Sequence, residues 1–503
     1  MPEEKEGTTR REFMERSAIA LAGLALAANT AEAVPAVVQG GARAGSSGGV
    51  DLPNLTIVEA AERIRTRQLS AAELTEAVLR RIDALNPKLG AFITVVSDQA
   101  MEAARAADRD IQQGKYLGPL HGIPVGVKDT HYTKGILTTA ASPVLKDFIP
   151  DFDCTNVERL RNAGAILVGK TNLPEFSFGG TTPGCQNPWD LSRNAGGSSG
   201  GSGSALAASL ILGATGGDTS GSIRIPASVN GCVGLKPTFG QVSRYGVIPI
   251  SWTLDHLGPM AKTVEDTAIL LNALAGHDPK DGFSARVPAQ DYRSQLRRDI
   301  RGMRIGYMAE SEIANFFPET RKAFFEAVKV FESLGARVQE VTYPERMRIS
   351  APAQRIIRIS EAATYHRQFL LSKADQYKTT DSNVRTTVEA GWLLTARQYL
   401  QCQRARRLFI QDMAKVLEPV DVLLSPTTAA PAGVQVNDAE TNLNGWNLCG
   451  FPAISLCCGF STSPAVLPIG LHIAAMPFQD ATVLAAAFAY ESATDMHRRH
   501  PNL

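Results

Sequence analysis

The glycine- and serine-rich stretch from Ala195 to Pro226 constrains the fold of this chain more than any other feature of its sequence. It reads AGGSSGGSGSALAASLILGATGGDTSGSIRIP. Such a composition is typical of a flexible linker. A linker would not carry the apolar segment 205–212, nor would it end in the ordered-looking run Ile223-Arg224-Ile225-Pro226. We therefore interpret the stretch as a buried, glycine-lined site.

Length and charge favour small-molecule chemistry in a large domain. The chain has 503 residues and is 44% hydrophobic, so it can bury a large core. At about 150 residues per domain the length would allow about three domains, but no linker supports that division. Lys plus Arg (51) nearly balances Asp plus Glu (50), which favours neither nucleic acid nor a membrane surface as partner. The seven cysteines include no C-x-x-C pair, so neither a disulfide framework nor a metal site is indicated.

The N-terminus resembles a twin-arginine export signal. Arg10-Arg11 is followed by Phe13, by an apolar run from Ala18 to Ala28 and by Ala31-Glu32-Ala33, the small-residue pattern of a cleavage site. The apolar run is shorter than the roughly 20 residues that span a bilayer. We expect a signal peptide at residues 1–33, export to the periplasm or the medium, and no stable membrane insertion after processing.

The remaining chain is expected to hold one globular unit. Residues 34–50 are small and weakly patterned, which predicts a disordered tether. The globular domain is expected over residues 51–495, with a C-terminal tail at 496–503. Thr56-Ile57-Val58-Glu59 and Ser70-Ala71-Ala72-Glu73 are capping boxes, each of which predicts the start of a helix.

Two lysines follow short apolar segments with the pattern of strands. Lys128 comes after Val125-Gly126-Val127, and Lys170 lies near the end of the segment 165–172. Such a lysine can reach from a strand end into solvent. It can instead be held among apolar neighbours, where desolvation lowers its pKa and makes the neutral amine available as a base. The residues alone leave both interpretations open for both lysines.

The segment Thr219-Ser220-Gly221-Ser222 best fits the needs of a serine nucleophile. Such a serine requires backbone N–H groups that can approach the developing oxyanion, which glycine permits. Gly216-Gly217-Asp218 precedes it and predicts a tight turn. The G-x-S-x-G elbow of the α/β-hydrolases is absent around Ser222, and no G-K-[ST] follows the glycines.

Several motifs together resemble those of the amidase signature family, the Ser-cisSer-Lys amidohydrolases. They are GPLHGIPVGVKD, GKTN, GGSSGGS, DTSGSIRIPA and GCVGLKPTFG, followed by GPM at 258–260, N-x-x-G-x-P at 447–452 and LPIG at 467–470. The resemblance covers about residues 51–495. It implies a single large α/β domain in which helices flank both faces of a mixed central β-sheet, and an enzyme that needs no cofactor.

The resemblance assigns three catalytic residues. Lys128 matches the catalytic lysine, Ser198 the serine whose peptide bond is cis, and Ser222 the nucleophile. The spacing to Ser222 matches the family when Ser198 is chosen rather than Ser199. Three histidines lie near the motifs and could serve as a rival base, but the resemblance gives none of them a catalytic role: His121, His131 and His256.

The resemblance also implies supporting roles in the loop around Ser222. The oxyanion hole would be formed by the backbone N–H groups of Thr219, Ser220, Gly221 and Ser222. Asp218 and Arg224 would brace the loop, although a simple surface ion pair would explain them equally well. Ser220 stands where many relatives have glycine. We expect the serine to be tolerated, because the expected role requires only its backbone N–H group.

The substrate pocket is less well marked. Phe176, Ser177 and Phe178 are candidate pocket residues, although the paired aromatics could equally be core. The segment 350–415 is expected to be largely helical and to shape the acyl or amine pocket. Residues 300–342 alternate strand, helix and strand, which predicts an α/β layer covering the sheet.

Taken together, the sequence predicts an amidase that hydrolyses a linear carboxylic amide to acid and amine or ammonia through a serine acyl-enzyme. One alternative is the glutamine-hydrolysing subunit of a tRNA-dependent amidotransferase. Export argues against it, and the family's glutamine-recognising arginine segment is not recognisable after Glu361. An esterase with the same triad is a second alternative. A periplasmic solute-binding protein is a third, although it leaves the co-occurrence of Lys128, Ser198 and Ser222 unexplained. The expected partner is a small-molecule amide, with no nucleic acid and with a homodimer as a possible assembly.

Overall fold

The computed structural model describes residues 50–288, 290–380, 382–436, 442–463 and 465–503. The expected signal peptide at 1–33 and the expected tether up to residue 49 lie outside the described residues. No helix in the described part of the chain is long and apolar enough to cross a membrane.

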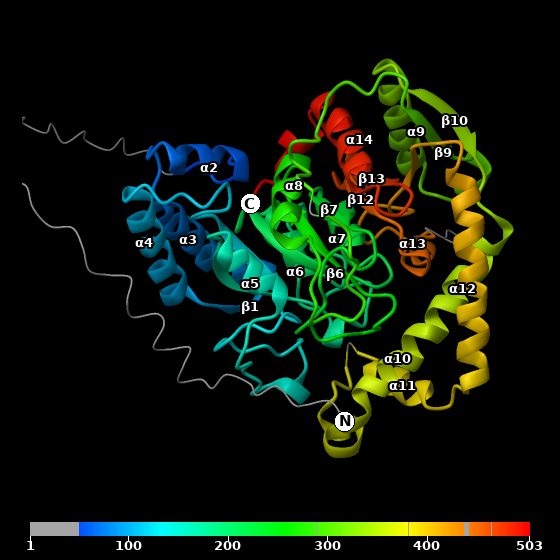
Figure 1. Cartoon of the computed structure of the whole chain (residues 1–503), viewed down its shortest axis with the longest axis horizontal. Helices are drawn as coiled ribbons and strands as arrows, with labels where there is room; N and C mark the ends of the chain where they lie inside the picture. The colour runs from blue at the N-terminus through cyan, green and yellow to red at the C-terminus, as the bar shows by residue number, and fades with distance from the viewer. Residues whose placement is uncertain (1–49, 289, 381, 437–441, 464) are drawn as a thin grey trace, which may run out of the picture. The chain divides into compact units, whose positions relative to one another are not determined.

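An eleven-stranded mixed sheet forms the centre of the domain (Figure 1). Its strands, from one edge to the other, are β1 (Phe92–Val95), β3 (Ile166–Thr171), β2 (Pro124–Lys128), β6 (Gly213–Asp218), β8 (His256–Ala261), β7 (Val233–Lys236), β12 (Ala453–Phe460), β13 (Pro468–Ala474), β11 (Val422–Pro426), β9 (Arg304–Met308) and β10 (Arg337–Val341). The pairs β3–β2, β2–β6, β11–β9 and β9–β10 are parallel, and the other pairs are antiparallel. A separate two-stranded ribbon pairs β4 (Gln186–Asn187) with β5 (Asp190–Asn194).

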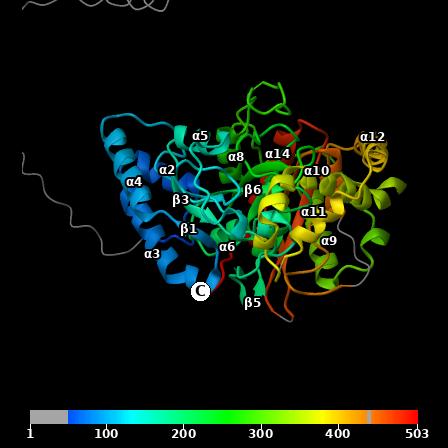
Figure 2. The ribbon, with the colours of Figure 1, turned by 90° about the horizontal axis from the view of Figure 1, so that it is seen from below.

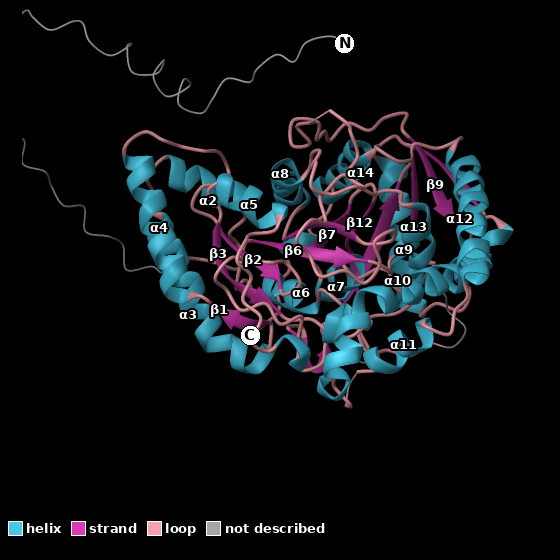
Figure 3. Ribbon diagram, turned by 60° about the horizontal axis from the view of Figure 1, so that its bottom comes forward, coloured by secondary structure: helices cyan, strands magenta, loops and turns pink. Residues whose placement is uncertain are grey.

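Helices cover both faces of this sheet, as the sequence predicts. They are α2 (Ile57–Arg65), α3 (Ala71–Leu89), α4 (Ser97–Gln112), α5 (Thr155–Asn162), α6 (Gly200–Ala207), α7 (Arg224–Asn230), α8 (Val264–Leu274), α9 (Pro318–Ser333), α10 (Ser350–Lys373), α11 (Val384–Gly391), α12 (Ala396–Leu417), α13 (Leu443–Cys449) and α14 (Asp480–Ser492). Figure 3 shows α5, α8 and α14 on one side of the row of strands and α6 and α7 on the other. Figure 2 shows that α10, α11 and α12 gather at the end of the sheet opposite α3 and α4.

Local sequence signals place the first helices. Thr56 and Ser70 each accept a hydrogen bond from the backbone of the glutamate three residues later, and each glutamate bonds back to the cap, so both predicted capping boxes are confirmed. The expectation for residues 300–342 is partly wrong. The strand, helix and strand form, but β9 pairs in parallel with β11 and extends the sheet instead of covering it.

The parallel pair β2 and β6 positions the candidate site. Val125 lies opposite Gly213, and Gly126 lies opposite Ala214. The carboxyl ends of parallel strands meet at one edge, where open α/β sheets commonly bind ligands. Lys128 ends β2 and Asp218 ends β6, so both side chains belong to this edge.

Candidate active site

Lys128 is the lysine that meets a serine of the glycine-rich stretch. Its side chain is 1% exposed, and its amine donates a hydrogen bond to Ser198 Oγ at 2.7 Å. A second, longer contact of 3.4 Å joins the amine to the carbonyl oxygen of Gly217. The backbone N–H of Lys128 donates to Thr215 Oγ1 at 3.1 Å, which fixes the end of the strand. The interpretation of Lys128 as a strand-end lysine in solvent is therefore wrong.

Burial lowers the pKa of Lys128 to about 7, although the nearby carboxylates of Asp255 and Asp218 act in the opposite direction. Burial disfavours the charged ammonium, so a substantial fraction of the amine is neutral near neutral pH. A neutral amine at 2.7 Å from a hydroxyl can accept its proton.

Lys170 is equally buried but lies in a different environment. Its amine donates to Thr133 Oγ1 and Thr138 Oγ1, both at 2.9 Å, and to the carbonyl oxygen of His131. Asp129 lies 3.6 Å away and forms an ion pair with it. These partners occupy the donors of Lys170, so its role is to hold together the turn after β2.

Ser198 and Ser222 lie on two segments that are tied to each other. The Gly197–Ser198 peptide bond is cis, the geometry that the family resemblance implies. The backbone N–H of Ser199 donates to the carbonyl oxygen of Ser222 at 3.1 Å. Among the hydrogen bonds of the described residues, none involves Ser222 Oγ. Both serines are buried, with 8% of Ser222 and 1% of Ser198 exposed.

Two glycines show why the stretch is rich in this residue. A Cβ on Gly201 would lie 2.2 Å from the backbone nitrogen of Asn172, so only glycine lets α6 approach the end of β3 this closely. Gly221 has a φ of +111°, and a Cβ there would lie 2.8 Å from Leu443 Cδ1. A larger residue at either position would displace the segment that carries a candidate catalytic serine.

The loop from Thr219 to Ser222 offers fewer free N–H groups than the resemblance implies. The N–H of Gly221 donates to Asp218 Oδ1 at 2.7 Å, so it is already occupied. Neither the N–H of Ser220 nor that of Ser222 has a protein acceptor among the described hydrogen bonds. The Thr219 hydroxyl donates to Asp255 Oδ1 at 2.6 Å, which ties the loop to the segment before β8.

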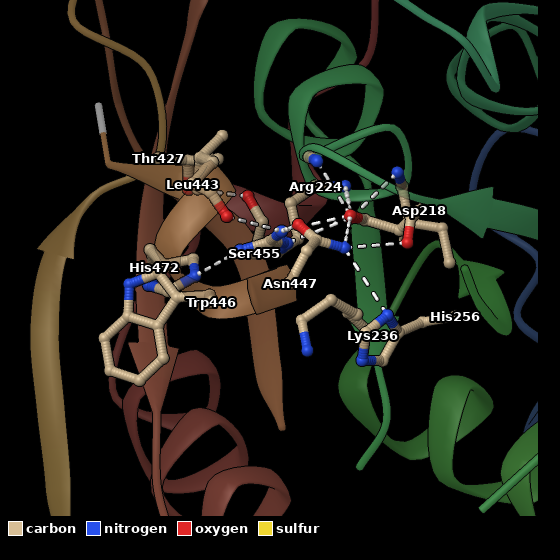
Figure 4. Close-up of polar contacts among 12 residues, drawn as sticks. Asp218, Arg224, Lys236, His256, Thr427, Leu443, Trp446, Asn447, Ser455 and His472 are labelled. Atoms are coloured by element: carbon tan, nitrogen blue, oxygen red, sulfur yellow. Dashed lines mark hydrogen bonds and ion pairs between the residues drawn. The ribbon is translucent and has the colours of Figure 1, made fainter. Parts of the chain in front are cut away.

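A buried polar network braces this loop (Figure 4). The Arg224 guanidinium donates from Nε and Nη2 to the two carboxylate oxygens of Asp218, each at 3.0 Å, and both side chains are fully buried. Burial alone would raise the pKa of the Asp218 carboxyl, but the charge and hydrogen bonds of Arg224 hold it well below its usual range. The interpretation of this pair as a surface ion pair is wrong.

Asn447 on α13 completes the network. Its side-chain amide donates to the carbonyl oxygen of Asp218 at 2.7 Å and to Asp218 Oδ1 at 2.8 Å, while its own oxygen accepts from Arg224 Nη2 at 2.7 Å. Arg224 Nη1 also contacts His472 Nε2 at 3.0 Å. The motif N-x-x-G-x-P contains Asn447, but nothing in the motif indicates that this side chain reaches the loop.

Gln354 on α10 holds the outer side of the same loop. Its side-chain N–H groups donate to the carbonyl oxygen of Thr219 at 2.8 Å and to Ser220 Oγ at 2.7 Å. Glu361, farther along the same helix, accepts from Ser251 Oγ at 2.5 Å and from Thr253 Oγ1 at 2.8 Å. Sequence reasoning missed both residues, because no local pattern marks them.

None of the three candidate histidines bonds to Ser198 or Ser222 among the described hydrogen bonds. His131 contacts the carbonyl oxygen of Lys128 at 3.2 Å, and burial lowers its pKa to about 3. His256 Nδ1 contacts the carbonyl oxygen of Leu254 at 2.7 Å, and burial also lowers its pKa. His121 accepts from the N–H of Leu117 at 3.2 Å. The geometry therefore favours lysine over histidine as the base.

A cavity of about 390 Å³ opens beside Lys128, Gly217 and Thr219. Its size falls in the range of small-molecule sites. Ser177 lines it, but Phe176 and Phe178 belong to a hydrophobic cluster beneath α10. Their rings lie 4.5 Å and 6.1 Å from that of His366. Ser177 thus lies where a pocket residue was expected, whereas the two phenylalanines follow the alternative interpretation as core.

Several known proteins are similar to this chain in sequence or in structure. A family profile described as Amidase matches residues 73–484. A glutamyl-tRNA(Gln) amidotransferase subunit from Desulfatibacillum aliphaticivorans is 40% identical, over 90% of this chain and 100% of its own length. A native peptide amidase from Stenotrophomonas maltophilia has 31% identity and a TM-score of 0.80, over 89% of this chain and 98% of its own. A glutamyl-tRNA(Gln) amidotransferase subunit from Thermotoga maritima has 32% identity and a TM-score of 0.73, over 88% and 95%.

These relatives correct the expected location. The curated relatives that match 90% of this chain are named as subunits of a glutamyl-tRNA(Gln) amidotransferase. The expectation of a periplasmic or secreted protein is therefore wrong, and the twin-arginine signal finds no support among them.

Proposed function

This chain belongs to the amidase family, and from that premise we propose that it hydrolyses carboxylic amides through an acyl-enzyme on Ser222. The observation that carries the proposal is the buried amine of Lys128, with a pKa of about 7, at 2.7 Å from Ser198 Oγ. This pair supplies a base and a relay next to the segment that bears Ser222.

The proposed reaction begins with two proton transfers. Neutral Lys128 accepts the proton of Ser198 while Ser198 Oγ accepts that of Ser222, and Ser222 Oγ then forms a bond to the amide carbonyl carbon. The carbonyl electron pair moves to oxygen. When the tetrahedral intermediate collapses, the C–N bond breaks as Ser198 Oγ gives one proton to the departing nitrogen, and Lys128 returns a proton to Ser198. Water then attacks the acyl-enzyme by the same route and releases the acid.

Backbone N–H groups would stabilise the oxyanion. Those of Ser220 and Ser222 are the best candidates, with Thr219 beside them. Each donor of this kind typically contributes about 3 kcal/mol to transition-state stabilisation. The N–H of Gly221 has a different task here, because it holds the carboxylate of Asp218. Asp218 and Arg224 serve as positioning residues that keep the loop in shape.

A second candidate is the glutamine-hydrolysing component of an amidotransferase, which the names of the curated relatives favour. The chemistry at Ser222 would be the same, with glutamine as the amide and ammonia as the leaving group. Such a component works together with partner chains, so it would hydrolyse glutamine well only in their company. An esterase remains the third candidate, because an ester is the easier acyl donor for the same triad.

One assay separates these candidates. The purified protein is incubated with L-glutamine, with aliphatic and aryl amides and with the matching esters, in parallel with Ser222→Ala and Lys128→Ala. Turnover of simple amides that falls at least about a thousandfold in both variants supports the proposal. Turnover of esters only, or of glutamine only when a partner chain is added, favours the corresponding alternative. Full activity in Ser222→Ala overturns all three.

Covalent labelling provides an independent check of the nucleophile. A fluorophosphonate should modify Ser222, since this serine is the proposed nucleophile. Peptide mapping by mass spectrometry identifies the labelled residue. Modification of another serine in the stretch, such as Ser199 or Ser202, would reassign the nucleophile.

A further inference from the structure

We propose that Tyr365 on α10 is a specificity-determining wall between the catalytic pocket and a second cavity, and that it limits the length of the apolar group that a substrate can carry. This inference rests on the proposed function for its catalytic readout. Its basis is the arrangement of the two cavities and not the chemistry at Ser222.

The two cavities share one residue. The first is the pocket of about 390 Å³ beside Lys128, here called the catalytic pocket, whose lining includes neither Ser198 nor Ser222. The second has a volume of about 570 Å³. Both have Tyr365 in their walls, and the described residues that line them have no other member in common. In the catalytic pocket Tyr365 stands with Ile248 and Ile250. In the second cavity it stands with Phe148 and Phe369.

Aromatic neighbours hold the Tyr365 ring in place. Its centroid lies 5.8 Å from that of Phe369 in an edge-on arrangement. Burial raises the pKa of the Tyr365 phenol, and the neighbouring phenol of Tyr132 adds to the effect. The Tyr132 ring itself packs edge-on against Phe148 at 5.0 Å. Removal of the Tyr365 ring would therefore open a passage between the two cavities, because the neighbouring rings are held by contacts other than those with Tyr365.

The walls of the second cavity indicate what it would accept. Val144 and Leu145 are buried members of the same hydrophobic cluster that supplies Ile248 and Ile250 to the catalytic pocket. One continuous apolar surface therefore borders both cavities. Charged groups occur at the rim, where Lys146 and Asp147 are exposed and the Lys373 amine donates to the carbonyl oxygen of Val144 at 3.0 Å. A straight alkyl chain fits the apolar part of this lining, and the charged groups remain at the rim.

The test compares chain-length profiles. Values of kcat/KM are measured for the primary amides of straight-chain acids from acetamide to decanamide, with the native protein, Tyr365→Ala and Tyr365→Phe. Each buried methylene contributes about fourfold, so kcat/KM should rise with length until the catalytic pocket is full and then fall. In Tyr365→Ala the ratio of the decanamide value to the acetamide value should increase at least about tenfold. Tyr365→Phe keeps the ring and should keep the native profile.

A binding measurement separates this inference from the proposed function. The affinities of the corresponding carboxylic acids are determined by calorimetry with Ser222→Ala alone and with Ser222→Ala combined with Tyr365→Ala. A gain in affinity for the longer acids in the double variant supports the wall even if no amide is turned over. The same length dependence in both proteins overturns the inference, whether or not the enzyme is active. Thermal unfolding of each variant verifies that it is folded.

Discussion

The side-chain amide of Asn447 donates to both the backbone carbonyl oxygen and a carboxylate oxygen of Asp218, at 2.7 Å and 2.8 Å. Asp218 in turn accepts the N–H of Gly221 at 2.7 Å. A residue of α13 therefore fixes the loop that bears Ser222, although more than two hundred residues separate them in the sequence.

We expect Asn447→Ala to lower kcat by about tenfold or more with a smaller change in KM, because the loop geometry matters most in the transition state. Steady-state kinetics on a simple amide measures both constants. Asn272→Ala is the matched control, since Asn272 is exposed and its side-chain amide donates to Asp291 at the surface. An unchanged kcat in Asn447→Ala would show that Asp218 and Arg224 hold the loop without it.

The pH dependence of kcat/KM should report the ionisation of Lys128. Burial lowers the pKa of this amine to about 7, and only the neutral form can accept a proton. The rate should therefore rise tenfold per pH unit below that value and level off above it. Lys128→Arg should be inactive, because a guanidinium does not deprotonate in this range. Lys170→Met should lower the melting temperature without changing the midpoint of the pH profile of kcat/KM. A shifted midpoint of that profile would implicate Lys170 in the reaction.

Loss of one partner of the buried Asp218–Arg224 pair should be strongly destabilising. Arg224→Met leaves a buried carboxylate without its counter-charge, which typically costs about 3 to 5 kcal/mol of unfolding free energy. Urea unfolding at neutral pH measures this. Arg304→Met is the control, since the pair of Arg304 with Asp421 is partly exposed and is expected to contribute less than about 1 kcal/mol.

The Asp218–Arg224 pair should also make the free energy of unfolding depend on pH. Arg224 holds the pKa of Asp218 below that of a free carboxyl, about 3.9, so its stabilisation is complete above that pH and is lost as the pH falls further. The free energy of unfolding of the native protein should therefore decrease below about pH 4, and Arg224→Met should show less of this decrease. Parallel curves for both proteins would assign the acid sensitivity to other carboxyl groups.

Two variants test whether Gln354 acts through the backbone of the oxyanion loop or through the Ser220 side chain. Ser220→Gly removes one acceptor of Gln354 but keeps the backbone N–H and the contact to the Thr219 carbonyl oxygen, so kcat should change by less than about threefold. Gln354→Leu removes both contacts and should lower kcat by about tenfold. The two variants are compared with the same amide at saturating concentration. Equal effects would mean that the Ser220 hydroxyl, and not the loop backbone, is what Gln354 holds.

Residues with local signatures are predictable from the sequence. The family motifs assign Lys128 and Ser222, and the spacing to Ser222 selects Ser198 over Ser199. The occupation of the Gly221 N–H is not predictable, because it depends on how the Asp218 carboxylate turns back onto the loop. Gln354 is equally hard to find, since a buried glutamine on a helix shows no pattern until tertiary packing gives it a partner.

The same limit applies to larger pieces. The strands of residues 300–342 are recognisable from the sequence. The edge at which they join the sheet is not, because it depends on the pairing of β9 with β11, a strand that follows more than a hundred residues later. Phe176 and Phe178 lie beside Ser177 in sequence, yet adjacent residues of a turn point in different directions. Of these three, only Ser177 lines the pocket.

Helix α10 carries Gln354, Glu361 and Tyr365 at intervals close to whole helical turns of 3.6 residues, so the three side chains share one face. The first donates to the loop that bears Ser222, and the last lines the cavity beside Lys128. One helix therefore contacts both the catalytic loop and the proposed wall of the pocket. A substitution that shifts α10 is expected to change kcat and the preferred substrate length together.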